Sequence, residues 1–387
     1  MMGRLREGVI RKSEDLPESK GHASWTDGMA MIRITRESRI NASIGPGFVF
    51  SGPEMMRLIM HSFIHSVCAL FLFSLLLCQP AHAGEKPEDS RQAIVLAAFG
   101  TTVPAALPGI LNIRDRIQRQ YPQTPVKIAF TSNIIRKIWQ KRRNDAAFIK
   151  DNPSVPADIY GVQGPLAAIA NLQDVGYRTI IVQPGHISDG EEYRDLAAYV
   201  DGLAGIRATK ARFNPFEKLV LSRPTMGTAG EEHPYTDDLT LIAKALADDA
   251  RLAAENGGVL LYMAHGNAYM ASGGAYIELA AIMNRMYPQI TTCIAMVEGY
   301  PSLQDTLPQL AATGSKRLLL KPFMTVAGDH TLNDMAGDEP ESWKSILRAK
   351  GYEVTTVARG LGESDAFADV YLHHLQQTAT DNGIVLH

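Results

Sequence analysis

The chain has 387 residues, of which 45% are hydrophobic and 20% are charged, and its formal net charge is −3 at pH 7. This balance is typical of a globular protein with a sizeable core, and it excludes a disordered or fibrous chain. The charge is nearly neutral and no basic cluster stands out, which speaks against a nucleic-acid partner.

The first 83 residues differ from the rest. An apolar run at residues 67–77 precedes an Ala-His-Ala sequence at residues 81–83. This pattern is typical of a cleaved secretory signal peptide, and the run is too short to span a bilayer. We therefore predict a disordered or over-extended leader at residues 1–54, a signal peptide at 55–83 cleaved after Ala83, and export to the periplasm with no stable membrane span. An internal signal anchor is the alternative.

Cysteine usage fits this prediction only in part. Cys68 and Cys78 lie inside the predicted signal, so Cys293 alone remains in the mature chain. No intramolecular disulfide can form, although the expected compartment is oxidising. Cys293 is expected to be a small buried residue in a strand.

After the signal, strands and helices alternate in two successive series. The first series has expected strands at residues 92–102, 126–130, 179–183 and 218–222, with helices at 104–121, 136–148, 166–175 and one ending near 203. The second has strands at 257–265, 292–297, 317–324 and 353–357, with helices at 236–255, 274–287, 302–312, 341–350 and 365–377. Such alternation predicts parallel sheets with helices on both faces.

The two series resemble each other. Residues 94–101 align with residues 260–267, and in this alignment Phe99 occupies the place of His265. We predict an α/β fold of two similar lobes, residues 84–230 and 231–387, each with a parallel sheet of about four strands and a cleft between the lobes. In this interpretation Phe99 shapes a substrate pocket, and the second lobe carries the metal ligands.

Three metal-binding residue types follow successive strands of the second lobe. His265 ends one strand, Glu298 follows the next, and His330 lies beyond the third, at separations of 33 and 32 residues. Ligands of open α/β sheets bind at the carboxyl ends of the strands. Two imidazoles and one carboxylate with open positions suit a divalent first-row metal held for chemistry. Taken singly, each His is more often a hydrogen-bonded loop residue, and Glu298 can cap the following helix.

These same residues carry a family resemblance. His265-Gly266-Asn267, the turn from Glu298 to Pro301, and the Gly328-Asp329-His330 element resemble the anaerobic sirohydrochlorin cobaltochelatases, which are ATP-independent enzymes related to ferrochelatases. The resemblance covers the chain from about residue 92. It implies that His265, Glu298 and His330 act catalytically by binding the incoming metal. The signal peptide matches periplasmic forms of the family.

Other polar residues have weaker assignments. Arg136, Arg194 and Lys321 are candidate partners for substrate carboxylates, against the alternative of solvated surface charges. His186 also follows a strand, so it is a candidate second metal or haem ligand, against the alternative of a loop residue. The other histidines considered, His233, His373 and His374, are expected at the surface.

The resulting functional prediction is a periplasmic chelatase that inserts Co²⁺, or Fe²⁺ or Ni²⁺, into sirohydrochlorin or a related tetrapyrrole. A metal ion held on one side can be handed to the macrocycle while a neutral His265 accepts a proton. No P-loop sequence is present, in agreement with an ATP-independent reaction. The alternatives are a metal or haem carrier without turnover and a metal-dependent hydrolase. A homo-oligomer is compatible with the sequence.

Overall fold

The computed structural model describes residues 91–387, so the predicted leader and signal peptide lie outside the described residues. Within 91–387, no helix has both the length and the apolar character that a membrane crossing requires.

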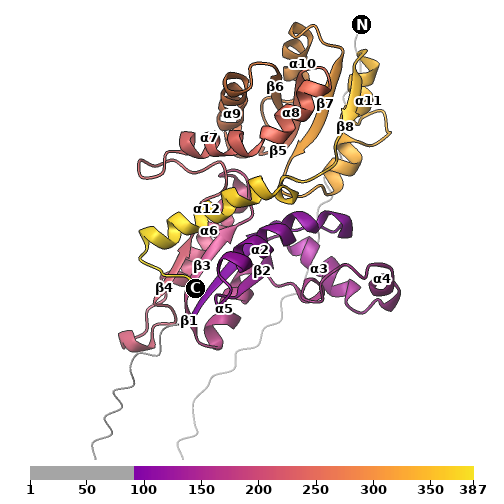
Figure 1. Ribbon diagram of the computed structural model, residues 1–387. Helices are drawn as coiled ribbons and strands as arrows, with labels where there is room; N and C mark the ends of the chain where they lie inside the picture. Colours follow the sequence, from indigo (N-terminus) through magenta and orange to yellow (C-terminus); the bar gives the residue numbers. More distant parts are fainter. Residues whose placement is uncertain (1–90) are drawn as a thin grey trace, which may run out of the picture. The chain divides into compact units, whose positions relative to one another are not determined.

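Within residues 91–387, the strands form two parallel sheets of four strands each (Figure 1). The first sheet has the order β2-β1-β3-β4 and the second has the order β6-β5-β7-β8, so the two sheets share one topology. This confirms the predicted α/β fold with two similar parallel sheets. The strands are β1 (Arg91–Ala98), β2 (Val126–Phe130), β3 (Tyr177–Pro184), β4 (Lys218–Leu221), β5 (Val259–Gly266), β6 (Thr291–Glu298), β7 (Arg317–Phe323) and β8 (Glu353–Thr356).

Helices connect the strands, and several begin at the side-chain caps that their sequences offer. Ser302 and Asp305 form a capping box, and Ser364 accepts a hydrogen bond from the backbone of Phe367. The α-helices are α2 (Pro108–Gln120), α3 (Asn133–Arg142), α4 (Ala146–Asp151), α5 (Pro165–Asp174), α6 (Glu191–Ala204), α7 (Tyr235–Ala245), α8 (Ala247–Glu255), α9 (Gly273–Met286), α10 (Leu303–Ala312), α11 (Trp343–Ala349) and α12 (Asp365–Asp381). Short helical turns are η1 (Pro104–Ala106), η2 (Ile159–Gly161), η3 (Ala211–Phe213), η4 (Thr331–Met335) and η5 (Leu361–Glu363).

Two expected helices are each divided in the structure. The helix expected at 236–255 breaks at Leu246, whose ψ of 15° leaves the helical range, and becomes α7 and α8. The helix expected at 136–148 becomes α3 and α4, because Asp145 has an extended backbone and caps α4. Local turn geometry overrides the longer apolar pattern in both cases.

The central strands are buried on both faces. In β1, Ile94 and Leu96 belong to one hydrophobic cluster, and Val95 and Ala97 belong to another. Helices cover both faces of each sheet, as parallel sheets require. The first cluster also contains residues of β5 and α12, so the two lobes share one continuous core.

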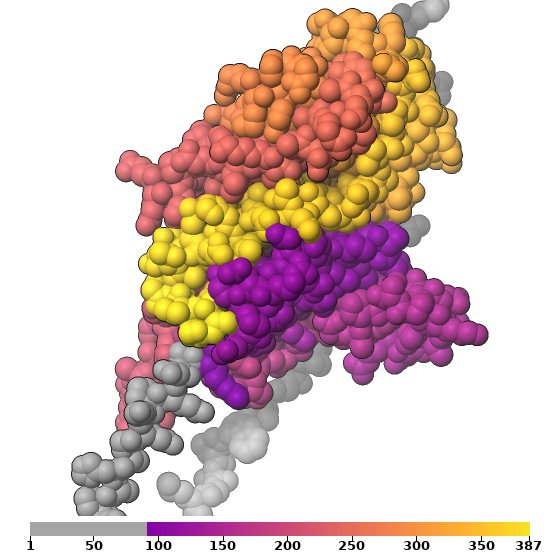
Figure 2. Space-filling view, in the orientation of Figure 1, coloured from indigo at the N-terminus to yellow at the C-terminus, as the bar shows by residue number. Residues whose placement is uncertain are grey.

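Helix α12 follows the second sheet in sequence and packs on the first lobe. It lies along α2, as the yellow helix beside the indigo one (Figures 1 and 2). Arg116 of α2 donates to Asp369 of α12 at 2.6 Å. The sequence-based lobe boundaries therefore stay predictions, since α12 falls within residues 231–387 but packs on both lobes.

A buried polar network also links the lobes. Arg223, just after β4, donates to Asp238 of α7 at 2.7 and 2.8 Å, and His374 of α12 lies 3.0 Å from the same carboxylate. Burial raises the pKa of Asp238, but the hydrogen bonds of Arg223 and His374 outweigh it, so the pKa falls below its usual value. The expectation of a surface position for His374 was wrong, because this side chain is buried in the network.

Candidate active site

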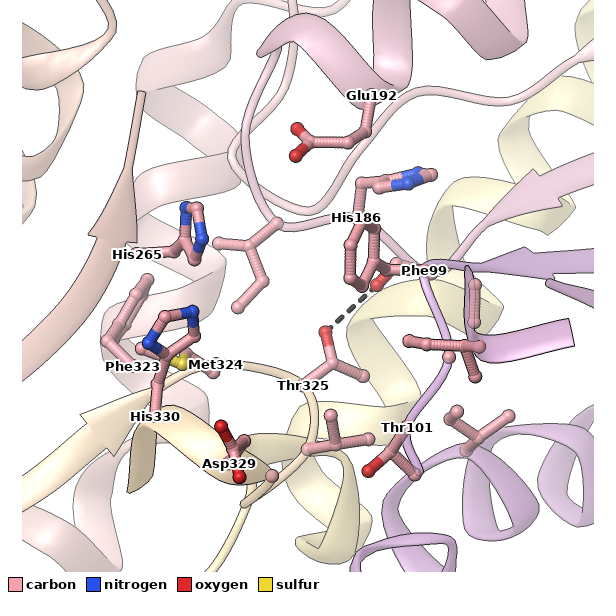
Figure 3. A pocket seen from close by; sticks show the side chains of 18 of the residues that line it. Phe99, Thr101, His186, Glu192, His265, Phe323, Met324, Thr325, Asp329 and His330 are labelled. Carbon is pink, nitrogen blue, oxygen red and sulfur yellow. Dashed lines mark hydrogen bonds between the residues drawn. The ribbon is translucent and has the colours of Figure 1, made fainter. Parts of the chain in front are cut away.

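A cavity of about 460 Å³ lies where the carboxyl ends of the two sheets face each other (Figure 3). Its lining comes mainly from the ends of β1 and β3 and the segments after them in the first lobe, and from the end of β5 and the end of β7 with its following segment in the second. Strands β1 and β3 are the central strands of the first sheet, and β5 and β7 are the central strands of the second. The site thus follows the rule that open α/β sheets place ligands at the carboxyl ends of their strands.

His265 and His330 meet in this cavity. Their ring centroids lie 5.1 Å apart, and the rings are nearly perpendicular. Nδ1 of His265 lies 3.1 Å from the carbonyl oxygen of Gly266, and Nδ1 of His330 lies 2.5 Å from Asp334 Oδ2. Partners at Nδ1 orient a histidine and leave Nε2 for a metal ion. Both Nε2 atoms are therefore left for a ligand, and His265 and His330 as metal ligands stay a prediction.

Glu298 stands next to this pair but outside the cavity lining. It is the last residue of β6, pairs in register with Gly266, and its side chain is exposed. Gly266 has a φ of +75°, and a Cβ there would lie 1.9 Å from the carbonyl oxygen of Glu298, so only glycine permits this approach. The three predicted ligands are His265, Glu298 and His330. Their ligand atoms do not all lie within 4.8 Å of one another. Glu298 as a ligand stays a prediction.

His186 lines the cavity from the first lobe. Burial lowers the pKa of its ring to about 4, so the imidazole is neutral near pH 7. Neither ring nitrogen has a hydrogen-bond partner among the described residues, and both are shielded from solvent. The preceding Gly185 is held by both lobes, since its N–H donates to Ala97 and its carbonyl accepts from Thr325 at 2.9 Å. The assignment of His186 as a metal or haem ligand stays a prediction.

Phe99 follows β1 and lines the cavity opposite the histidine pair (Figure 3). Phe99 is 47% exposed, so its ring is accessible to a ligand in the cavity. Together with Phe323 and Met324, it gives the cavity an apolar wall. This placement agrees with the predicted pocket-shaping role.

The three predicted cationic substrate partners do not line the cavity. Arg136 bonds to the backbone of Phe130 and Thr131, and partial burial lowers its pKa. Arg194 forms a two-pronged ion pair with Asp189, whose hydrogen bond raises the pKa of the guanidinium.

Lys321 is buried within β7 and paired with Asp249 of α8. Tyr262, its neighbour on β5, donates to the same carboxylate at 2.6 Å. Lys321 therefore points to the helix side of the sheet rather than to the strand ends. As a strand-interior residue it does not reach a ligand in the cavity, which corrects its assignment as a substrate partner.

Glu192 is a cavity residue that the sequence did not single out. It lies in the first turn of α6, directly after the loop that follows β3, and it projects toward the cavity across from His265 (Figure 3). Helix α6 begins with two adjacent glutamates, and either carboxylate could simply stabilise the positive N-terminal end of the helix. Only the fold distinguishes the exposed Glu191 from the partly buried Glu192.

Comparison with known proteins identifies the family. Residues 92–380 match the cobalt chelatase (CbiK) family. The chain belongs to this family. The sequence-based resemblance to cobalt chelatases is thereby confirmed.

Two curated relatives carry more specific names. The sirohydrochlorin cobaltochelatase CbiKC of Nitratidesulfovibrio vulgaris is 31% identical, and the alignment covers 74% of this chain and 90% of the relative. The sirohydrochlorin cobaltochelatase of Salmonella typhimurium is 28% identical, with 74% and 96% covered. Among solved structures, SirB from Bacillus subtilis with Fe³⁺ aligns with a TM-score of 0.49 and 11% identity, covering 77% of this chain and 100% of SirB.

Proposed function

We propose that this protein inserts Co²⁺ into sirohydrochlorin without ATP. The observation that carries the proposal is the pair His265 and His330, which meet in a cavity between the lobes of a cobalt chelatase family member. The relatives named sirohydrochlorin cobaltochelatases support the choice of macrocycle and metal. Here the metal ion is a substrate and not a resident cofactor.

The metal is held from one side of the cavity. Nε2 of His265 and Nε2 of His330 supply two nitrogen ligands, and Glu298 supplies a carboxylate by rotation of its exposed side chain. Ligands on one side leave open coordination positions, through which the cation passes to the macrocycle nitrogens. This donor set accepts several first-row divalent ions, so Fe²⁺ and Ni²⁺ are secondary substrates in the proposal.

The macrocycle occupies the other side of the cavity. Insertion replaces two pyrrole protons with one M²⁺, so two protons must leave for each metal that enters. Glu192 is one acceptor that the cavity offers, and His265 becomes a second once its Nε2 has released the metal ion to the macrocycle. Phe99 and Met324 form the apolar wall against which a flat ring system packs.

Export to the periplasm is part of the proposal and rests on residues 55–83. Amino-terminal sequencing of the protein from a periplasmic fraction should return Gly84 as the first residue. Recovery of the uncleaved chain from the membrane fraction would favour the signal-anchor alternative instead.

The decisive experiment follows sirohydrochlorin absorbance with Co²⁺ under anaerobic conditions. The protein should accelerate conversion to the metallated macrocycle, and both His265→Ala and His330→Ala should abolish the acceleration. His373→Ala, a histidine outside the cavity, is the matched control and should retain the rate. Macrocycle binding with metallation no faster than without protein would identify a carrier and overturn the chelatase proposal.

A further inference from the structure

An imidazole and two carboxylates converge at a place remote from the active-site cavity. Glu232 and His233 lie in the segment between β4 and α7, and Asp381 is the last residue of α12. One ligand atom from each of the three lies within 4.8 Å of the others. His233 Nε2 is 2.7 Å from Asp381 Oδ2. None of the three takes part in the proposed insertion reaction.

The cluster carries more negative than positive charge. Asp381 closes a 17-residue helix whose last turn contains no basic residue, so its carboxylate sits at the negative end of the helix dipole. Lys218 binds the next two carbonyls, of residues 382 and 383, rather than this carboxylate. A bound cation would relieve the repulsion between Asp381, Glu232 and the helix end.

Nearby arginine does not neutralise the cluster. Arg223 borders the same region, but its guanidinium is committed to Asp238 and to Gln377. Two members of the cluster, Glu232 and His233, line a hollow of about 400 Å³ whose lining also includes Asp237, His373 and one lysine, Lys244. The acidic side chains therefore outnumber the uncommitted cation, which favours entry of a positive ion from solvent.

The burial of the three residues suits an ion that enters from solvent. Glu232 is exposed, while the side chains of His233 and Asp381 are 25% and 31% exposed. Three protein ligands leave open positions that water fills, as in other sites built from imidazole and carboxylate. An imidazole nitrogen beside carboxylates selects first-row divalent ions such as Zn²⁺ or Co²⁺ over Mg²⁺ or Ca²⁺.

We propose that Glu232, His233 and Asp381 form a second divalent-metal site, independent of the active-site cavity. The site joins two chain connections between the lobes. The segment with Glu232 and His233 leads from β4 of the first sheet to α7 of the second lobe, and α12 returns from the second sheet to the first lobe. A metal ion here fastens one connection to the other, beside the buried network of Arg223, Asp238 and His374.

Titration calorimetry with Zn²⁺ on the full chain tests the proposal. The wild type should bind two ions. The double variant His265→Ala/His330→Ala, which removes the cavity ligands, should keep one ion, and its melting temperature should rise when Zn²⁺ is added. Adding His233→Ala or Asp381→Asn to the double variant should abolish both effects.

Two further variants guard against misinterpretation. Glu232→Gln replaces an exposed side chain, so it should leave folding intact and weaken the retained site about tenfold. His373→Ala removes a neighbouring imidazole that is not part of the cluster, and it should leave Zn²⁺ affinity unchanged. Circular dichroism verifies that each variant is folded before titration.

Two results would overturn the inference. One is a double variant that binds no Zn²⁺ while the folded wild type binds one ion. The other is a retained ion whose affinity is the same in Glu232→Gln and His233→Ala. Neither result bears on the chelatase proposal, because cobalt insertion is measured separately and depends on His265 and His330.

Discussion

The two lobes have the same strand order but different residues at the ends of their central strands. Phe99 follows β1 in the first lobe, whereas His265 lies at the end of β5 in the second. Both residues line the same cavity. The shared topology thus brings four strand ends together, and the side chains at those ends decide what each lobe contributes.

The two lobes also differ in the segments that follow β3 and β7, the third strand of each sheet along the chain. His186 follows β3 and is buried, so its pKa falls to about 4 and its ring stays neutral. His330 follows β7, and its side chain is 44% exposed and paired with Asp334. The oriented imidazole of His330 is accessible to an ion from solvent, whereas both ring nitrogens of His186 are shielded in this structure. The comparison teaches that a histidine at a strand end is not by itself a ligand.

Making the second lobe resemble the first should have the largest effect. His265→Phe places the first lobe's residue type at the end of β5 and removes one of the two proposed nitrogen ligands. We expect cobalt insertion to fall by at least about 100-fold, because losing a ligand costs more than losing its orienting partner. The initial rate with sirohydrochlorin measures this, and Phe99→His in the same background should not restore activity. Recovery by Phe99→His would mean that the lobes are interchangeable.

Removing the partner that orients His330 should have the next largest effect. Asp334→Asn weakens the contact at Nδ1, which is 2.5 Å long. We expect Co²⁺ affinity to fall by about 10- to 100-fold. Asp338→Asn is the matched control, since Asp338 lies shortly after η4, which contains Asp334, but pairs with Lys344 at the surface. Equal losses in both variants would indicate a general disturbance of the loop rather than a specific role for Asp334.

Removing the aromatic ring of Phe99, which the first lobe contributes to the cavity, should have a moderate effect on substrate binding. Phe99→Ala deletes an exposed apolar surface from the cavity wall, which we expect to raise KM for sirohydrochlorin about tenfold, or about 1.4 kcal/mol. Metal affinity should not change, because the proposed ligands belong to the second lobe. Steady-state kinetics and Co²⁺ titration separate the two quantities. A loss of metal affinity in Phe99→Ala would contradict the division of labour between the lobes.

The sequence predicted the backbone frame better than the side-chain environment. Short apolar runs bounded by glycines indicated the strands, and their repetition indicated two similar sheets. The convergence of His265 and His330 followed from strand ends alone, because parallel strands deliver their last residues to one edge. These features depend on local pattern and general topology.

Side-chain partners could not be predicted in the same way. Lys321 reads as a strand-end cation, but it is paired with Asp249, which lies 72 positions earlier in the chain. His374 reads as a surface residue on an amphipathic helix, but α12 returns to the first lobe and buries it against Asp238. Glu192 is distinguished from Glu191 only by the direction in which α6 leaves its loop. Each outcome depends on tertiary packing between distant segments.

Substitution of Arg194, an exposed cation of the first lobe, should have the smallest effect. Arg194 is 58% exposed and already paired with Asp189, and such surface ion pairs contribute about 0–1 kcal/mol. We therefore expect Arg194→Gln to change kcat/KM for sirohydrochlorin by less than about twofold. Glu192→Gln, two positions earlier on α6, is the matched contrast because Glu192 lines the cavity, and it should lower kcat more than Arg194→Gln does. A large rise in KM for Arg194→Gln alone would mean that the guanidinium leaves Asp189 to bind a substrate carboxylate. The first lobe would then contribute charge as well as apolar surface.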